Sequence, residues 1–137
     1  SCFEKAGGFH PAFFMYSEDV EFLQRIRSVG FGVGVSVDCA IFHDRSRNEQ
    51  KEQRGDGLKN NPLRVHKGSV FSIALAPGVD AKRKAAAIRS KTVRFSIRYL
   101  RRGNISAMRQ ALAASREARN LMNSNVFEDA KRVLFSS

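Results

Sequence analysis

The segment 17–27 constrains the fold most, because its residues recur with the period of an α-helix. The side chains spaced i, i+3, i+4 and i+7, which share one helical face, are Asp19, Phe22, Leu23 and Ile26. Ser17 is placed to cap this helix, since its hydroxyl can accept from the free N–H groups of the first turn. The pattern predicts that Asp19 faces the buried side. The charged residues expected on another side are Glu18, Glu21 and Arg25.

The adjacent acids Glu18 and Asp19 have two explanations. A carboxylate aimed toward apolar side chains is costly unless it lines a cleft or has a partner, which is the setting of a general base. Alternatively, two acids in a first helical turn simply interact favourably with the helix macrodipole. The two acids alone fit both explanations, and only the residues around them can distinguish a general base from a first-turn pair.

A period-two pattern follows the helix. Apolar side chains occupy the odd positions from Phe31 to Ile41, and small or polar residues separate most of them. This alternation predicts a half-buried β-strand. His43 has the same parity and is expected on the apolar side at the strand end. A single histidine there is either structural or a metal ligand.

These motifs resemble the second half of an inverting family-2 glycosyltransferase with the glycosyltransferase A fold. The matching residues, in order, are Gly7-Gly8-Phe9, Phe13-Phe14, Tyr16-Ser17-Glu18-Asp19, Arg25-Ile26-Arg27, Gly30-Phe31 and, after the strand, His43. The likeness covers the first third of the chain, and the rhamnosyltransferase-like branch resembles it best. Two positions depart from the family pattern, because His10 and Glu21 stand where the family usually has an acid and an aspartate.

The resemblance implies roles for four residues. Asp19 would be the general base that deprotonates the acceptor hydroxyl, and Glu18 would support Asp19 or bind the acceptor. Tyr16 would also bind the acceptor. His43 would help to hold a divalent cation, Mg²⁺ or Mn²⁺. The partners implied are a nucleotide-sugar donor, carrying a hexose such as rhamnose, and a glycan or lipid-linked acceptor.

The sugar-nucleotide half of such an enzyme is not recognisable in these residues. Family members bind the nucleotide and most of the metal through an N-terminal unit with an Asp-x-Asp motif, which does not occur here. The sequence opens with Ser1 and enters the motif region directly. We therefore expect a fragment that is inactive alone, with its cation bound mainly by the missing half.

Composition is that of a globular chain, with 42% apolar and 27% charged residues. No apolar run approaches the roughly 20 residues of a membrane span. Cys2 and Cys39 lack zinc-type spacing, and we expect free thiols in a reducing cytosol. Charge is unevenly placed: residues 1–43 hold three Lys or Arg and five Asp or Glu, whereas residues 44–137 hold 21 and eight. The later region is therefore expected to meet an anionic partner.

Cap and breaker residues predict helices after a polar loop at 44–61, where an acceptor-binding flap or a linker is expected. Asn61-Pro62 begins a helix that Pro77-Gly78 ends, and Asp80 caps a long helix that runs to Arg102. Shorter helices are expected at about 105–122, with Met108, Leu112 and Met122 among the inward residues, and at 126–135. Asn125 and Glu128 suit a capping box for the last one.

The long helix is basic and amphipathic. The cations that gather on one arc are Lys91, Arg94, Arg98, Arg101 and Arg102. This pattern fits a segment lying on an anionic membrane surface. It equally fits a core-packing helix with a solvated face, or a helix that pairs with another chain. Nucleic acid is a less favoured partner, because no helix-turn-helix, zinc pattern or aromatic stacking platform is present.

Two regions result. Residues 1–61 are expected to be the acceptor-side part of an α/β glycosyltransferase domain with a flexible loop at 44–61, and residues 62–137 a basic, mainly helical region. The function expected is hexose transfer from a nucleotide sugar, with an anionic-surface module as the alternative. The location expected is cytoplasmic, on the cytoplasmic face of a membrane if the basic helix binds lipid.

Overall fold

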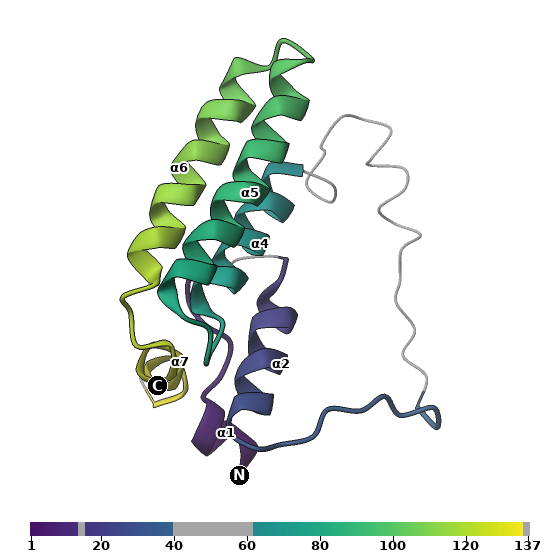
Figure 1. Ribbon diagram of the computed structural model, residues 1–137. Helices are drawn as coiled ribbons and strands as arrows, with labels where there is room; N and C mark the ends of the chain where they lie inside the picture. Colours follow the sequence, from purple (N-terminus) through teal and green to yellow (C-terminus); the bar gives the residue numbers. More distant parts are fainter. Residues whose placement is uncertain (14–15, 40–61, 136–137) are drawn as a thin grey trace.

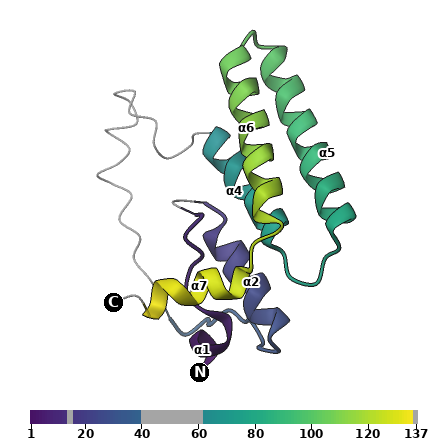
Figure 2. The same cartoon turned by 90° about the vertical axis from the view of Figure 1, so that its left-hand side faces the viewer.

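The structure is a computed structural model that describes residues 1–13, 16–39 and 62–135. All of its regular elements are α-helices, in the order α1 Cys2–Ala6, α2 Glu18–Ser28, α4 Pro62–Leu75, α5 Ala81–Leu100, α6 Ile105–Leu121 and α7 Val126–Phe135. Helices α4, α5 and α6 lie side by side, and α1, α2 and α7 gather near one end of them (Figure 1). Turned by 90°, α7 is seen to lie crosswise to α5 and α6 (Figure 2).

The expected α/β fold is wrong, because the described residues contain no strand. Residues 31–39, which carry most of the period-two pattern, are irregular. Val35 and Val37 are 92% and 90% exposed. A strand needs a neighbouring strand for its N–H and C=O groups and a surface for its apolar side chains, and no described segment supplies either. Residues 40–61, including Ile41, His43 and the expected loop, lie outside the described residues.

The helices predicted for the later region are confirmed by α4, α5, α6 and α7. Local signals set the ends of several of them. Asp80 caps α5 by accepting a hydrogen bond from the Arg83 N–H at 3.0 Å, and Asn104 caps α6 through the Ala107 N–H at 2.9 Å. The turn between α5 and α6 ends at Gly103, whose φ of 68° suits glycine. At α7 the Asn125 side chain accepts from the Glu128 N–H at 3.4 Å.

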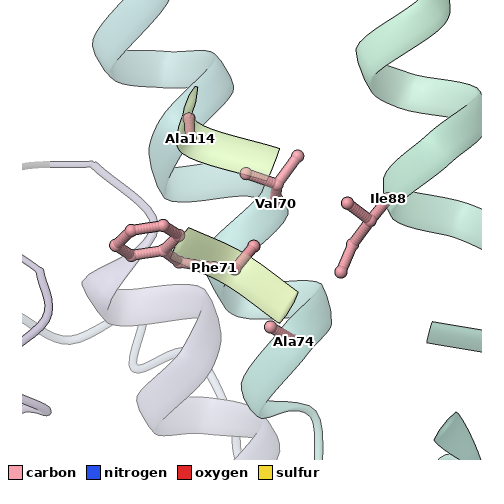
Figure 3. Packing of buried hydrophobic residues seen from close by; sticks show 6 residues of the cluster. Val70, Phe71, Ala74, Ile88 and Ala114 are labelled. Carbon is pink, nitrogen blue, oxygen red and sulfur yellow. The ribbon is translucent and has the colours of Figure 1, made fainter. Parts of the chain in front are cut away.

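The main core lies where α4, α5 and α6 meet. Val70, Phe71 and Ala74 of α4 pack with Ile88 of α5 and with Ala114 and Ala118 of α6 (Figure 3). The buried face of α6 consists of small residues, which let the three helices approach closely: Ala107, Ala111, Ala114, Ser115 and Ala118. Leu112, expected to point inward, is exposed. None of the helices in the described part of the chain is long and apolar enough to cross a membrane.

We predict that Ile88→Ala lowers the free energy of unfolding by about 2 to 5 kcal/mol, because it removes a fully buried side chain from this core. Ile97 of the same helix is 45% exposed, so Ile97→Ala is the matched control and is expected to cost less than about 1 kcal/mol. Urea unfolding of both variants measures the difference. Equal costs would contradict the placement of Ile88.

Candidate functional site

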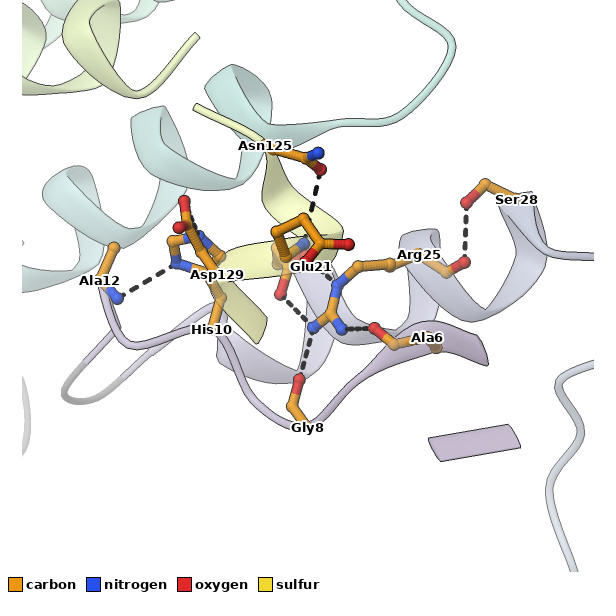
Figure 4. A network of polar contacts seen from close by, with 10 residues as sticks. Ala6, Gly8, His10, Ala12, Glu21, Arg25, Ser28, Asn125 and Asp129 are labelled. Carbon is orange, nitrogen blue, oxygen red and sulfur yellow. Dashed lines mark hydrogen bonds and ion pairs between the residues drawn. The ribbon is translucent and has the colours of Figure 1, made fainter. Parts of the chain in front are cut away.

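The Glu-Asp motif lies at the N-terminal end of α2, and an ion pair one turn later determines which face of α2 is buried. Glu21 and Arg25 are both 0% exposed. The Arg25 guanidinium donates from Nε to Glu21 Oε1 at 2.7 Å and from Nη2 to Glu21 Oε2 at 2.9 Å. It also donates to the backbone carbonyls of Ala6 and Gly8, the latter at 2.7 Å (Figure 4). One buried side chain thus joins α2 to the last residue of α1 and to the segment that follows it.

The expected orientation of α2 is confirmed for Ile26, which is buried, but it is wrong for the charged residues and for Leu23. Asp19 and Leu23 are exposed, whereas Glu21 and Arg25, expected on another side, point into the protein. The helical spacing did not reveal this, because it follows the apolar residues and does not show that distant carbonyls can accept hydrogen bonds from a buried Arg25. Each donor of a buried guanidinium needs an acceptor. The Glu21 carboxylate and two carbonyls from residues 6–8 supply four acceptor contacts here.

An aromatic cluster centred on Phe22 lies beside this ion pair. Phe22 lies between Phe3 and Phe9, with ring centroids 5.6 and 5.0 Å away. The guanidinium carbon of Arg25 is 5.4 Å from the Phe22 ring centroid. A guanidinium near an aromatic ring gains a cation–π contact in addition to its hydrogen bonds. The motif residues are therefore packed around a single charged side chain.

Glycine is required where α7 meets the motif segment. Gly7 has a φ of 77°, and a Cβ built on it would lie 2.9 Å from the backbone of Ala130. The Gly8 N–H donates to the Ala130 carbonyl at 3.2 Å. Any side chain at Gly7 would push α7 away. The Gly7-Gly8 pair thus serves as the docking point of α7, which the sequence pattern did not indicate.

His10, which departs from the family pattern, belongs to the same contact. It is buried, its Nδ1 accepts from the Ala12 N–H at 3.2 Å, and its Nε2 lies 3.8 Å from Asp129 Oδ2 of α7. Because Nδ1 is an acceptor, the hydrogen-bond network assigns the proton of the neutral ring to Nε2. Burial lowers the pKa of His10, and the Glu21 and Asp129 carboxylates act in the opposite direction.

The turn before α2 is strained and rests on α4. Tyr16 and Ser17 are consecutive non-glycine residues with positive φ, 71° and 68°. Ser17 makes no side-chain cap, contrary to the prediction. A Cβ on Gly68 of α4 would lie 2.4 Å from the Tyr16 carbonyl oxygen, so only glycine lets α4 support this turn. Paired strain of this kind costs about 1 to 3 kcal/mol per residue and is concentrated at functional sites.

The two acids differ in their surroundings. Asp19 is exposed, and its Oδ1 accepts from the Val20 N–H at 2.8 Å. Glu18 is half-buried, and its Oε2 is buried without a hydrogen-bond partner among the described residues. An exposed carboxylate beside a partly buried one can accept a proton from a hydroxyl that reaches it. Glu18 directly precedes Asp19 and Tyr16 lies three residues before it, so their role in an acceptor site stays a prediction.

No metal centre is found in the part of the chain that the structure describes. There, no three His, Cys, Asp or Glu side chains gather closely enough to hold an ion. His43 lies outside that part, so its role as a ligand stays a prediction. The five basic residues predicted to bind an anionic surface are all exposed on α5 and the turn after it.

Comparison with protein-family models, with curated proteins and with solved structures finds no match for this chain. The resemblance to family-2 glycosyltransferases therefore stays a prediction. The structure adds a packed unit in which Arg25 binds Glu21 and the carbonyls of Ala6 and Gly8, with Glu18 and Asp19 at the start of the same helix.

We predict that Arg25→Met lowers the free energy of unfolding by about 3 to 5 kcal/mol, because it leaves the buried Glu21 carboxylate without a partner. Arg27→Met removes an exposed cation from the same helix and is expected to cost less than about 0.5 kcal/mol. The double variant Glu21→Leu with Arg25→Met should cost less than Arg25→Met alone. Chemical unfolding measures all three, and an equal cost for Arg25→Met and Arg27→Met would contradict the assignment.

Proposed function

We propose that this chain is a fragment of a glycosyltransferase, with its acceptor-side part in residues 1–61. The enzyme transfers a hexose, with rhamnose as the leading candidate, from a nucleotide sugar to a hydroxyl of a glycan or lipid-linked acceptor. The observation that supports it most is the packed unit around Arg25. This unit holds the helix that carries the two acids against the segment of Gly7 and Gly8, and Asp19 is exposed at the start of that helix. A helical pair present only for the macrodipole requires neither the strained turn nor the buried ion pair behind it.

In the proposed reaction Asp19 takes the proton of the acceptor hydroxyl. The hydroxyl oxygen then forms a bond to the anomeric carbon while the bond from that carbon to the diphosphate oxygen breaks, and the electron pair leaves with the nucleoside diphosphate. Glu18 and Tyr16 bind and orient the acceptor beside Asp19. A divalent cation, Mg²⁺ or Mn²⁺, would neutralise charge on the leaving group, with His43 and the nucleotide-sugar unit as its proposed ligands.

The second candidate function is binding to an anionic membrane surface, which the exposed face of α5 favours. Helix α5 contains no Asp or Glu. Beside its basic arc, Val93, Ile97 and Leu100 are 49%, 45% and 55% exposed. Cations beside exposed apolar side chains suit the lipid interface better than nucleic acid, which would contact only the cations. In this proposal the two functions are compatible, since the helix would hold the enzyme at the cytoplasmic face of a membrane that carries its acceptor.

We predict that Asp19→Asn lowers the transfer rate at least 100-fold, the range expected for loss of a general base, while leaving nucleotide-sugar binding unchanged. The assay uses the full-length protein of which this chain is proposed to be a fragment, a radiolabelled nucleotide sugar, and an extract that supplies the glycan or lipid-linked acceptor. Glu128→Gln is the control, because it removes an exposed carboxylate from the first turn of α7. Transfer by Asp19→Asn at the wild-type rate would exclude Asp19 as the base.

We predict that Arg101→Gln with Arg102→Gln weakens binding to phosphatidylglycerol vesicles about 30-fold, since each basic residue contributes about 1 kcal/mol at such a surface. Arg116→Gln with Arg119→Gln removes two exposed cations of α6 and is the matched control. Vesicle co-sedimentation measures the binding, with phosphatidylcholine vesicles as the neutral comparison. Equal binding by both double variants, or to both lipids, would contradict a specific role of the basic arc. Salt-sensitive DNA binding without vesicle binding would favour nucleic acid instead.

A further inference from the structure

A groove of about 480 Å³ runs between α4 and α5. The two helices that form it lie side by side (Figure 1). Its charged and polar lining comes from both helices, with His66 and Ser69 on α4 and Lys91, Arg94 and Arg98 on α5. Val65 and Phe95 add apolar surface. The groove is thus large enough for a small organic group.

The charge of the groove is uncompensated. Its three cations are exposed, and no acidic side chain among the described residues lines it. None of the ion pairs between described residues involves Lys91, Arg94 or Arg98. Spacings of three and four residues place all three on one helical face. Like charges held together repel one another, so an anion that enters the groove is stabilised by all three.

A buried histidine forms part of the groove wall. His66 is only 4% exposed and stacks on Phe95, with ring centroids 4.3 Å apart. Its Nε2 is buried and makes no geometrically good hydrogen bond to a described residue. Burial lowers the pKa of His66, the Lys91 ammonium lowers it further, and the Ala111 backbone acts in the opposite direction. The charge of Lys91 therefore acts on the protonation of His66.

The aromatic ring of the groove already stacks within the protein. Phe95 stacks on His66 at 4.3 Å and on Tyr99 at 4.4 Å, so part of its stacking surface is occupied by other side chains. A nucleobase would gain little from such a wall, since base recognition without sequence preference depends on free aromatic faces. The groove is instead suited to a compact anion with several acceptor oxygens and an aliphatic attachment that lies against Val65.

We propose that the groove between α4 and α5 binds a phosphate ester, with Arg94 and Arg98 donating to the phosphate oxygens and with Lys91 and the Ser69 hydroxyl completing the shell. Guanidinium groups match the geometry of phosphate oxygens and bind them bidentately. The ester is either a soluble sugar phosphate or the headgroup of a lipid, because both present the same chemistry. The site differs from surface binding by α5, since it also needs the Ser69 hydroxyl of α4 and lies beside His66. It can therefore be present when surface binding is absent.

The test is NMR titration of the histidine ring carbons of the 137-residue chain, with glycerol 3-phosphate as the soluble ester and phosphatidylglycerol nanodiscs as the lipid. His66→Gln assigns the resonance. A bound phosphate opposes the field of Lys91, so the pKa of His66 is expected to rise on saturation. His10 does not line the groove and is the internal reference, with no change expected.

Arg94→Gln with Arg98→Gln is expected to weaken glycerol 3-phosphate binding at least tenfold, whereas Arg116→Gln with Arg119→Gln leaves it unchanged. Circular dichroism checks that both double variants keep their helices. A response of His66 to the nanodiscs alone identifies a lipid headgroup, and a response to both ligands identifies a general phosphate-ester site. No response of His66 to either ligand, or equal binding by the two double variants, overturns the proposal.

Discussion

The buried ion pair between Glu21 and Arg25 is the interaction on which the motif region depends. A guanidinium taken out of water requires an acceptor for nearly every donor, and Arg25 finds them in Glu21 and in the carbonyls of Ala6 and Gly8. This requirement orients α2, holds the segment after α1 against it, and leaves Asp19 on the exposed side. The accessible carboxylate is thus a consequence of what is buried behind it.

Two glycines allow the motif region to pack closely against α7 and α4. Gly7 lets α7 dock on the motif segment, and Gly68 lets α4 support the strained turn at Tyr16 and Ser17. Phe13 then packs on Phe71, with ring centroids 6.2 Å apart, which joins the motif region to the core of α4, α5 and α6. Helix α4 therefore connects the motif region with the three-helix core.

The charge distribution separates two proposed roles in space. Glu18 and Asp19 lie in the first turn of α2, next to the turn that contacts α4, whereas the cations lie along α5, a different helix (Figure 1). A transferase acting on a membrane-held acceptor would gain from this division, because the basic helix can bind anionic lipid while the carboxylates meet a hydroxyl. The groove between α4 and α5 adds a position where a single phosphate group would be recognised.

Local signals in the sequence determined the helices from residue 62 onward, because Pro62, Asp80, Asn104 and Gly103 act within one turn of the element that they start or end. The strand expected across 31–41 was wrong over 31–39, because alternation becomes a strand only when a partner strand is present. The face that α2 buries was also decided by tertiary structure, since the two backbone acceptors of Arg25 lie 17 and 19 residues away in the chain. The acids themselves were evident from the sequence. Their surroundings, the strained turn and the α4–α5 groove arise only when distant segments pack together.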